Sequence, residues 1–250
     1  MSERELIYGL HAVTAVLESG GRVHALWMLD SRHDDRLTKV AALAEKAGVK
    51  ILRVPRAELD RLTEGARHQG VAVQADGAPQ MDEGGLMPLL DRLREPPFLL
   101  VLDGVQDPHN LGACLRSANA AGVHAVISPR DRSAGLTPVA RKVASGAAEA
   151  TPFFQVTNLA RTLRELKERN IWFVGLAGEA DQTLYELDLK GPLAIVMGAE
   201  GEGMRRLTKE HCDFLAKIPM DGSVESLNVS VATGISLFEA HRQRHTKPKK

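Results

Sequence analysis

The chain has 250 residues, a length that suits one large domain or two small ones. Lysine plus arginine equals aspartate plus glutamate at 32 each, so net charge selects no partner, although a neutral protein can still carry a local basic face. Aromatic residues make up only 4%, which argues against an aromatic platform for base stacking. The two cysteines, Cys114 and Cys212, lack the number and spacing of a disulfide framework or a zinc knuckle.

The chain begins with charged residues, has no apolar leader, and contains no apolar run of about 18 residues. We therefore expect a reduced, soluble, cytoplasmic protein with no membrane partner. The histidines give one helical pair, His241 and His245, which lies in a basic tail, so we expect no metal site.

The first part of the chain alternates between helical and strand periodicity. The expected elements, in chain order, are a helix from Leu10 to Leu17, a strand over Val23–Leu29, a helix over Leu37–Ala47, and strands over Val49–Val54 and Val71–Gln74. Glycines and prolines then accumulate over 76–97, which predicts a linker with a short helix near 87–94. We expect a small α/β domain over residues 1–75.

The alternation between helical and strand periodicity resumes at Phe98. Strands are expected at Phe98–Asp103, His124–Ser128, Phe153–Val156, Ile171–Ala177, Leu193–Gly198 and Phe214–Ile218. Several of these runs are continuously apolar, which indicates a parallel sheet that is buried on both faces. Helical stripes follow two N-cap candidates: Leu159, Leu163 and Leu166 after Asn158, and Val231, Ile235 and Phe238 after Asn228. The end, 241–250, is a basic tail that is either frayed or in contact with RNA.

The first candidate site segment runs from the strand end at Asp103 to Arg116. Asn110 is predicted to cap a helix that runs to about Ala121 and buries Leu111, Cys114, Leu115 and Ala118. Helical side chains lean toward the N-terminus, so Arg116 is expected to point back toward Asn110, where a phosphate would bind. The alternative is a simple cap plus a surface arginine paired with Asp107.

The second segment is Gly198-Ala199-Glu200-Gly201-Glu202-Gly203. Its glycines do not have the dinucleotide-binding spacing, but they permit close backbone approach to a ligand. Glu200 could accept a hydrogen bond from a hydroxyl or balance Arg116. The alternative is an ordinary turn with solvated acids.

The third segment, Ser226-Leu227-Asn228-Val229-Ser230, enters the last helix. Ser226 or Asn228 could cap that helix, whereas Leu227, an apolar residue in a polar loop, suits the wall of a flat ligand. Parallel strands bring such loops to one sheet edge, so the three segments predict one composite site.

In order, spacing and loop residues, these segments resemble the three motifs of the SpoU branch of the trefoil-knot (SPOUT) RNA methyltransferases, over about Phe98–His241. Residues 8–13 and 67–72 are similar to the ribosomal-protein-like substrate domain of bacterial members. The resemblance implies an α/β fold with a deep C-terminal trefoil knot over 98–250, a small α/β RNA-binding domain before it, and a homodimer with the knots packed together. It also implies methyl transfer from S-adenosyl-L-methionine to a guanosine 2′-hydroxyl. The RNA partner would be 23S rRNA or a ribosomal precursor, and DNA would not be a partner.

By the same resemblance, the polar residues of the active site are Asn110, Arg116, Glu200, Ser226 and Asn228. The cofactor contacts are Leu176, Ala177, Gly178, Gly198, Glu200, Ile218, Met220 and Leu227. The motif arginine, Arg116, is proposed as the base in this family; the alternative is that it holds a phosphate and stabilises the developing alkoxide, because guanidinium groups hardly lose their proton. Two alternatives are ribose methylation of tRNA by an enzyme of the same branch, and RNA binding without catalysis, although the intact motif residues argue against the second.

Overall fold

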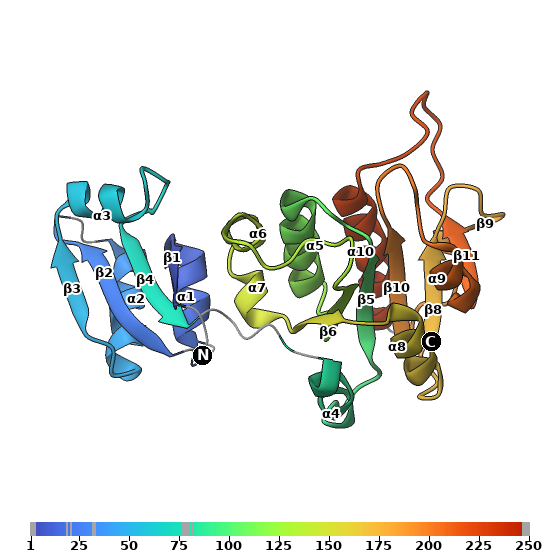
Figure 1. The fold of residues 1–250 in the computed structure, drawn as a ribbon, viewed down its shortest axis with the longest axis horizontal. Coiled ribbons are helices and arrows are strands. Elements are labelled where there is room, and N and C mark those ends of the chain that lie inside the picture. Colours follow the sequence, from blue (N-terminus) through green and yellow to red (C-terminus); the bar gives the residue numbers. More distant parts are fainter. Residues whose placement is uncertain are drawn as a thin grey trace.

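The computed structural model describes residues 4–18, 20, 22–31, 34–76, 81 and 83–246, and contains two separate sheets (Figure 1). The first is built from β1 (Arg4–Tyr8), α1 (Leu10–Glu18), β2 (Val23–Leu29), α2 (Asp35–Lys46), β3 (Ile51–Val54), α3 (Arg56–Leu62) and β4 (Val71–Asp76). Its strand order is β1-β4-β2-β3, with β4 antiparallel to β1 and β2 and with β2 parallel to β3. Three strands therefore end at one edge, where α1, α2 and α3 begin.

The core of this first unit explains most of its elements. Val13 and Val40, from α1 and α2, are fully buried with Leu26 and Val73 of the sheet. The expected strand over 23–29 is confirmed at both ends. β1 was missed because only Ile7 of its five residues is buried, so the strand has no clear alternation.

The second sheet has seven strands in the order β7-β6-β5-β10-β8-β11-β9. Its strands are β5 (Phe98–Asp103), β6 (Ala125–Pro129), β7 (Phe153–Val156), β8 (Trp172–Leu176), β9 (Gln182–Thr183), β10 (Leu193–Gly198) and β11 (Phe214–Lys217). Its helices are α5 (Pro108–Ala120), α6 (Pro138–Ala144), α7 (Ala147–Ala150), α8 (Leu159–Lys167), α9 (Arg206–His211) and α10 (Val229–His245), with a 3₁₀ turn, η2, at Leu184–Glu186. All of the named strand pairs in this sheet are parallel, as the apolar runs predicted.

Side chains of β5 alternate between the two faces of this sheet. Leu100 and Leu102 pack with α5 and α10, whereas Leu99 and Val101 pack with α8. Both faces are covered, which confirms the interpretation of the continuously apolar strands. The expected cap of α8 is also confirmed, because the Asn158 side chain accepts a hydrogen bond from the Arg161 amide.

The apolar stripe of α10 does not face the core as a helical stripe ordinarily does. Val231 and Phe238 are 50% and 47% exposed, and Ile235 is only partly buried. The helix instead buries its opposite side, including Thr233, Ser236 and Leu237, against α5 and β10. The expected basic tail, 241–250, continues α10 as a helix over 241–245, and 247–250 lie outside the described residues.

A buried arginine joins the two units. Arg141 of α6 forms ion pairs with Glu5 of β1 at 2.9 Å and with Glu149 of α7 at 3.0 Å. The side chains of Arg141 and Glu149 are 8% and 3% exposed. Burial raises the pKa of Glu149, partly offset by Arg141. Gly146, between α6 and α7, lies so close to α1 that an added Cβ would stand 3.0 Å from the Ala15 Cβ.

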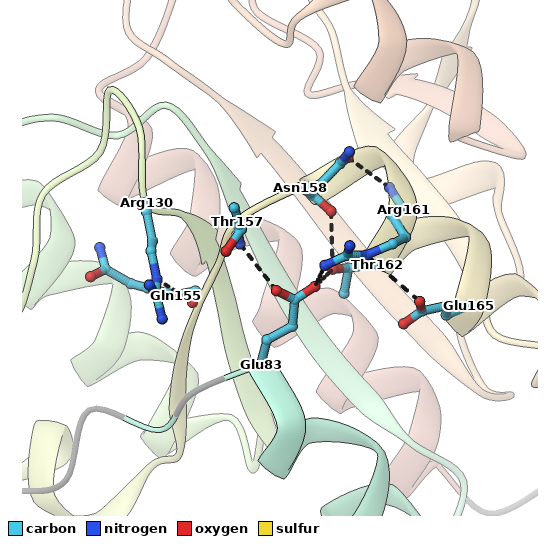
Figure 2. Close-up of polar contacts among 8 residues, drawn as sticks. All are labelled: Glu83, Arg130, Gln155, Thr157, Asn158, Arg161, Thr162 and Glu165. Atoms are coloured by element: carbon cyan, nitrogen blue, oxygen red, sulfur yellow. Dashed lines mark hydrogen bonds and ion pairs between the residues drawn. The ribbon is translucent and has the colours of Figure 1, made fainter.

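The expected linker over 76–97 contains a 3₁₀ turn, η1 (Glu83–Gly85), and a helix, α4 (Leu86–Asp91). Leu86 and Leu90 are buried against the second sheet. Glu83 points at the start of α8, where its carboxylate accepts hydrogen bonds from the Thr157 amide at 3.3 Å, the Thr162 hydroxyl at 3.4 Å and the Arg161 guanidinium (Figure 2). The residues from 83 onward therefore pack with the second sheet.

We predict that Glu83→Gln lowers the free energy of unfolding by about 1 kcal/mol at pH 7. Burial alone would raise the pKa of Glu83, but the hydrogen bonds from Arg161, Thr157 and Thr162 outweigh it, so the pKa lies below the ordinary value of 4.5. A lowered pKa contributes stability above 4.5 that is lost as the pH falls through the folded-state pKa. Denaturant titrations at several pH values should therefore show the variant and the parent converging in acid.

The matched control is Glu165→Gln, which removes a carboxylate from the same arginine. Glu165 lies 3.8 Å from Arg161 and is half exposed (Figure 2). We expect less than about 0.5 kcal/mol for this control. Equal losses in the two variants would contradict the role assigned to Glu83.

In the described part of the chain, no helix combines the length and apolarity needed to cross a membrane.

Candidate active site

The first two candidate segments lie side by side because the strands that lead into them are paired. β10 runs parallel to β5, with Gly198 opposite Asp103 at the last register position. The third segment follows β11, which lies beyond β8 on the other side of β10. All three segments therefore leave the same edge of the sheet, at the upper side of Figure 1.

Three polar side chains from the three segments meet directly. The Asn228 amide nitrogen donates to the Asn110 side-chain oxygen at 3.0 Å and to the Glu200 carboxylate at 2.7 Å. The Asn228 oxygen in turn accepts from the Ser230 amide at 2.9 Å and from its hydroxyl at 2.6 Å. This Asn110–Glu200–Asn228 cluster joins positions up to 118 residues apart.

Asn110 was expected to cap α5, and Ser226 or Asn228 to cap α10; the first expectation was wrong. Asn228 does cap α10. α5, however, is capped by Asp107, whose side chain accepts from the His109 amide, and Pro108 occupies the first helical turn. Proline suits this position because it needs no amide donor there. Asn110 lies one turn further in, so its side chain is available to Asn228.

Arg116 and Ser226 do not join this cluster. Both are exposed. Among the described residues, Arg116 pairs with neither Asp107 nor Glu200. Asp107 caps α5 instead, and Glu200 accepts from Asn228 and the Val229 amide. The expected buried face of α5 is confirmed, with Leu111, Cys114, Leu115 and Ala118 all buried. Arg116 lies outside this buried face and is exposed to solvent.

The residues expected to contact a cofactor gather at three neighbouring strand ends. Leu176 ends β8 and is followed by Ala177 and Gly178, Gly198 ends β10, and Ile218 and Met220 follow β11. The β8 and β11 ends are held together by the Ala177 amide, which donates to the Ala216 carbonyl at 2.9 Å. Leu176, Ile218 and Leu227 are partly exposed, and an added Cβ at Gly178 would meet nothing within 4 Å. Partly exposed apolar walls beside open glycine backbone suit a flat, mostly apolar ligand with a few polar groups.

One ion pair at this edge was not foreseen. The Asp103 carboxylate is completely buried and accepts from the Arg205 amide at 2.9 Å and from its guanidinium at 2.6 and 2.5 Å. Arg205 follows the Glu200 loop, so this pair anchors that loop to the end of β5. The sequence shows an aspartate at the end of a strand and an arginine after the glycine loop. Their spacing gives no indication that the two residues pair.

We predict that Asp103→Asn lowers the free energy of unfolding by about 2 kcal/mol, because three charge-assisted contacts to Arg205 are weakened. The Glu200 loop should also shift, so any activity of the site should fall with stability. Thermal unfolding followed by calorimetry measures the first effect. Asp107→Asn is the control, since Asp107 is exposed and asparagine caps helices equally well; a control as unstable as Asp103→Asn would contradict this assignment.

Neither cysteine is a candidate nucleophile. Burial raises the pKa of the Cys114 thiol to about 11 and that of the Cys212 thiol to about 12, with nearby Asp213 adding to the second shift. Thiols with such raised pKa values are almost wholly protonated at neutral pH and react slowly. Across the described residues, no three His, Cys, Asp or Glu side chains gather as a metal site would require.

Comparisons with known proteins place the whole chain among relatives of one kind. The model of the SpoU rRNA Methylase family matches residues 97–238, and one described as RNA 2'-O ribose methyltransferase substrate binding matches residues 6–81. A Photorhabdus laumondii protein named 23S rRNA (guanosine-2'-O-)-methyltransferase RlmB is 62% identical over 241 residues, which cover 96% of this chain and 98% of the relative. The Escherichia coli K12 protein of the same name is 59% identical, with 96% and 99% covered.

The fold has solved counterparts. The crystal structure of an AdoMet-bound rRNA methyltransferase from Sinorhizobium meliloti matches with a TM-score of 0.78 at 26% identity, covering 97% of this chain and 88% of the other. The sequence matches span both sheets described above, and the family match contains all three segments of the composite site. The chain therefore belongs to the SpoU rRNA Methylase family.

Proposed function

We propose that this chain transfers a methyl group from S-adenosyl-L-methionine to the 2′-hydroxyl of a guanosine in 23S rRNA. The observation that carries this proposal is the direct contact of Asn110, Glu200 and Asn228, one residue from each of the three motif segments. The near full-length relatives at 59–62% identity support the substrate, since their names specify guanosine in 23S rRNA.

The residues at the ends of β8, β10 and β11 suit S-adenosyl-L-methionine as the cofactor. S-adenosyl-L-methionine supplies an electrophilic methyl group on a sulfonium when it is bound. Leu176, Ile218 and Leu227 would form the apolar walls for its adenine, and backbone near Ala177, Gly178, Gly198 and Met220 would hold its polar edges. Glu200, a member of the Asn110–Glu200–Asn228 cluster, would also border this cofactor site.

The ribose would lie against the cluster, where the protein's task is orientation of the hydroxyl. Correct placement of reacting groups can lower a barrier by about 7–11 kcal/mol in the best cases. Asn228 is held by Glu200 and Asn110, so its position is fixed before the substrate arrives. Ser226, exposed just before it, is positioned to contact the ribose or the neighbouring nucleotide.

Arg116 would bind the phosphate next to the target ribose and stabilise the negative charge that develops on the oxygen. This role suits an exposed guanidinium without a carboxylate partner among the described residues, and guanidinium groups keep their charge in proteins. We favour it over the role of base. A pH–rate profile that lacks any ionisation assignable to Arg116 would count against the role of base, and one that contains such an ionisation would support it.

The exposed stripe of α10, formed by Val231, Ile235 and Phe238, suits a homodimer interface. The resemblance to trefoil-knot enzymes also predicts a knot in 98–250. In support, the segment after β11 returns past β8 and β10 to bring Asn228 against the Glu200 loop, and α10 then packs on α5. Residues 1–75 would form the RNA-binding domain, and 76–97 the connection, in a cytoplasmic enzyme.

The substrate class is tested by incubating the protein with labelled S-adenosyl-L-methionine and either a 23S rRNA transcript or unmodified tRNA. We expect label in the 23S transcript alone. Label in tRNA alone would establish the tRNA enzyme, and cofactor binding without transfer to either RNA or to ribosomal precursors would favour an RNA-binding protein without catalysis.

A further inference from the structure

A pocket of about 550 Å³ lies in the first unit, at the edge where β1, β2 and β3 end. It is bordered by Leu10 and Leu29 at its apolar base and by the loop 65–70. Its volume falls within the range of roughly 300–1,000 Å³ that is typical for sites holding one small organic ligand. It is separate from the Asn110–Glu200–Asn228 cluster, which belongs to the other sheet.

Three arginines line this pocket from three different elements. Arg36 comes from the first turn of α2, Arg56 from the start of α3, and Arg67 from the loop after α3. All three are exposed, and among the described residues Arg36 and Arg67 have no ion-pair partner. The one lining carboxylate, Asp60, is engaged by His68 at 2.9 Å and lies 3.7 Å from Arg56. The pocket therefore carries an uncompensated positive charge.

The rim of the pocket is held in shape by hydrogen bonds. The Gly70 amide donates to His68 Nδ1 at 3.0 Å, so Nε2 of this buried ring carries the proton that is donated to Asp60. The neighbouring Gln69 has a left-handed backbone, with φ of 56°, and its side chain accepts from the Leu10 amide at 3.0 Å. Left-handed backbone at a non-glycine residue is strained and requires support from its surroundings, which the contact with Leu10 provides here.

We infer that this pocket binds one unpaired nucleotide of the RNA substrate, away from the nucleotide that is methylated. Arginine matches phosphate oxygens with paired donors and also stacks on bases, which is how proteins read single-stranded RNA when few aromatic residues are present. The apolar base of Leu10 and Leu29 suits the base or sugar, and the arginine rim suits its phosphates. This inference rests on the proposed function, because it takes an RNA as the substrate.

The position of the pocket agrees with an RNA that contacts both units. The loop after α3, which borders the pocket, and the loop after β11, which leads to Asn228, lie on the same side of the molecule in Figure 1. The ion pair between Arg141 and Glu5 joins the two units. A structured RNA could therefore place one nucleotide in the pocket and another at the methyl-transfer site.

The charge of the pocket is tested with the triple variant Arg36→Gln, Arg56→Gln and Arg67→Gln. The control triple, Lys39→Gln, Lys46→Gln and Arg61→Gln, removes the same charge from exposed residues of α2 and α3 that do not line the pocket. We expect the pocket variant to bind a 23S rRNA transcript at least about tenfold more weakly at 0.1 M salt, and to show a shallower salt dependence. Binding of S-adenosyl-L-methionine should be the same in both triples.

The shape of the pocket is tested without a change of charge. Ala66→Trp would fill the pocket, whereas Ala57→Trp adds the same side chain to an exposed face of α3 outside it. Only Ala66→Trp should weaken RNA binding and raise the KM for RNA, with kcat at saturating RNA and the melting temperature close to the control.

Equal RNA binding by the pocket variants and their controls would overturn this inference. If wild-type protein transferred no methyl group to the transcript, the proposed function would fail instead, and the binding comparison would still report on the pocket.

Discussion

Replacement of Arg116 with alanine should reduce kcat/KM for methyl transfer by about 10²–10³-fold, as expected when one group that stabilises developing charge is lost. Arg116 is exposed on α5, so the fold loses no core contact. The dissociation constant for S-adenosyl-L-methionine and the melting temperature should therefore stay unchanged. Single-turnover transfer of labelled methyl to the 23S transcript measures the effect.

Arg164→Ala is the matched control for this experiment. Arg164 is an exposed arginine on α8, which packs on the opposite face of the sheet from α5. We expect activity within about twofold of wild type, since surface substitutions away from special features have small effects. Full activity in Arg116→Ala, or an equal loss in Arg164→Ala, would show that the role proposed for Arg116 is wrong.

The second large effect is expected at Gly198. A Cβ added there would lie 2.1 Å from the Gly203 carbonyl carbon and 2.2 Å from the Met204 nitrogen. These are backbone atoms of a loop that is closed by two hydrogen bonds of 3.0 Å between Ala199 and Gly203, so they have little freedom to move. Gly198→Ala should lower the free energy of unfolding by about 3 kcal/mol.

The same substitution should displace Glu200. This displacement should disturb both the proposed cofactor site and the hydrogen bond from Asn228 to Glu200. Gly191→Ala is the control, because an added Cβ at Gly191 meets nothing within 4 Å and its backbone is not left-handed. Denaturant unfolding and cofactor titration of both variants measure these effects. Normal stability and cofactor affinity in Gly198→Ala would contradict the close approach of the loop to β10.

Strands buried on both faces were the elements that the sequence predicted best. Phe98–Asp103 and Leu193–Gly198 match β5 and β10 at both ends, because continuous apolar residues stop where the polar loops begin. Short or half-exposed elements carried less signal, which is why β1 and the two-residue β9 were missed. The apolar stripe of α10 was visible in the sequence as a helical repeat of apolar residues. Such a repeat does not show whether the protein core or another chain covers the stripe.

The site could be predicted only in part for a related reason. The three segments were recognisable as loops at strand ends, and parallel strands bring such loops together. Pairwise contacts depend on strand order, which no local pattern contains, so the pair of Asp103 with Arg205, 102 residues apart, had no signal. The cap at Asn110 was mispredicted because Asp107-Pro108 offered an equally good start three residues earlier.

The most direct test of the proposed function is the identity of the methylated atom. A 23S rRNA transcript incubated with the protein and S-adenosyl-L-methionine should be digested to nucleosides and analysed by mass spectrometry, with alkaline hydrolysis to locate the resistant bond. A composite site that orients a ribose predicts 2′-O-methylguanosine at one position. A methyl group on a base, or the absence of methylation in the presence of bound cofactor, would contradict it.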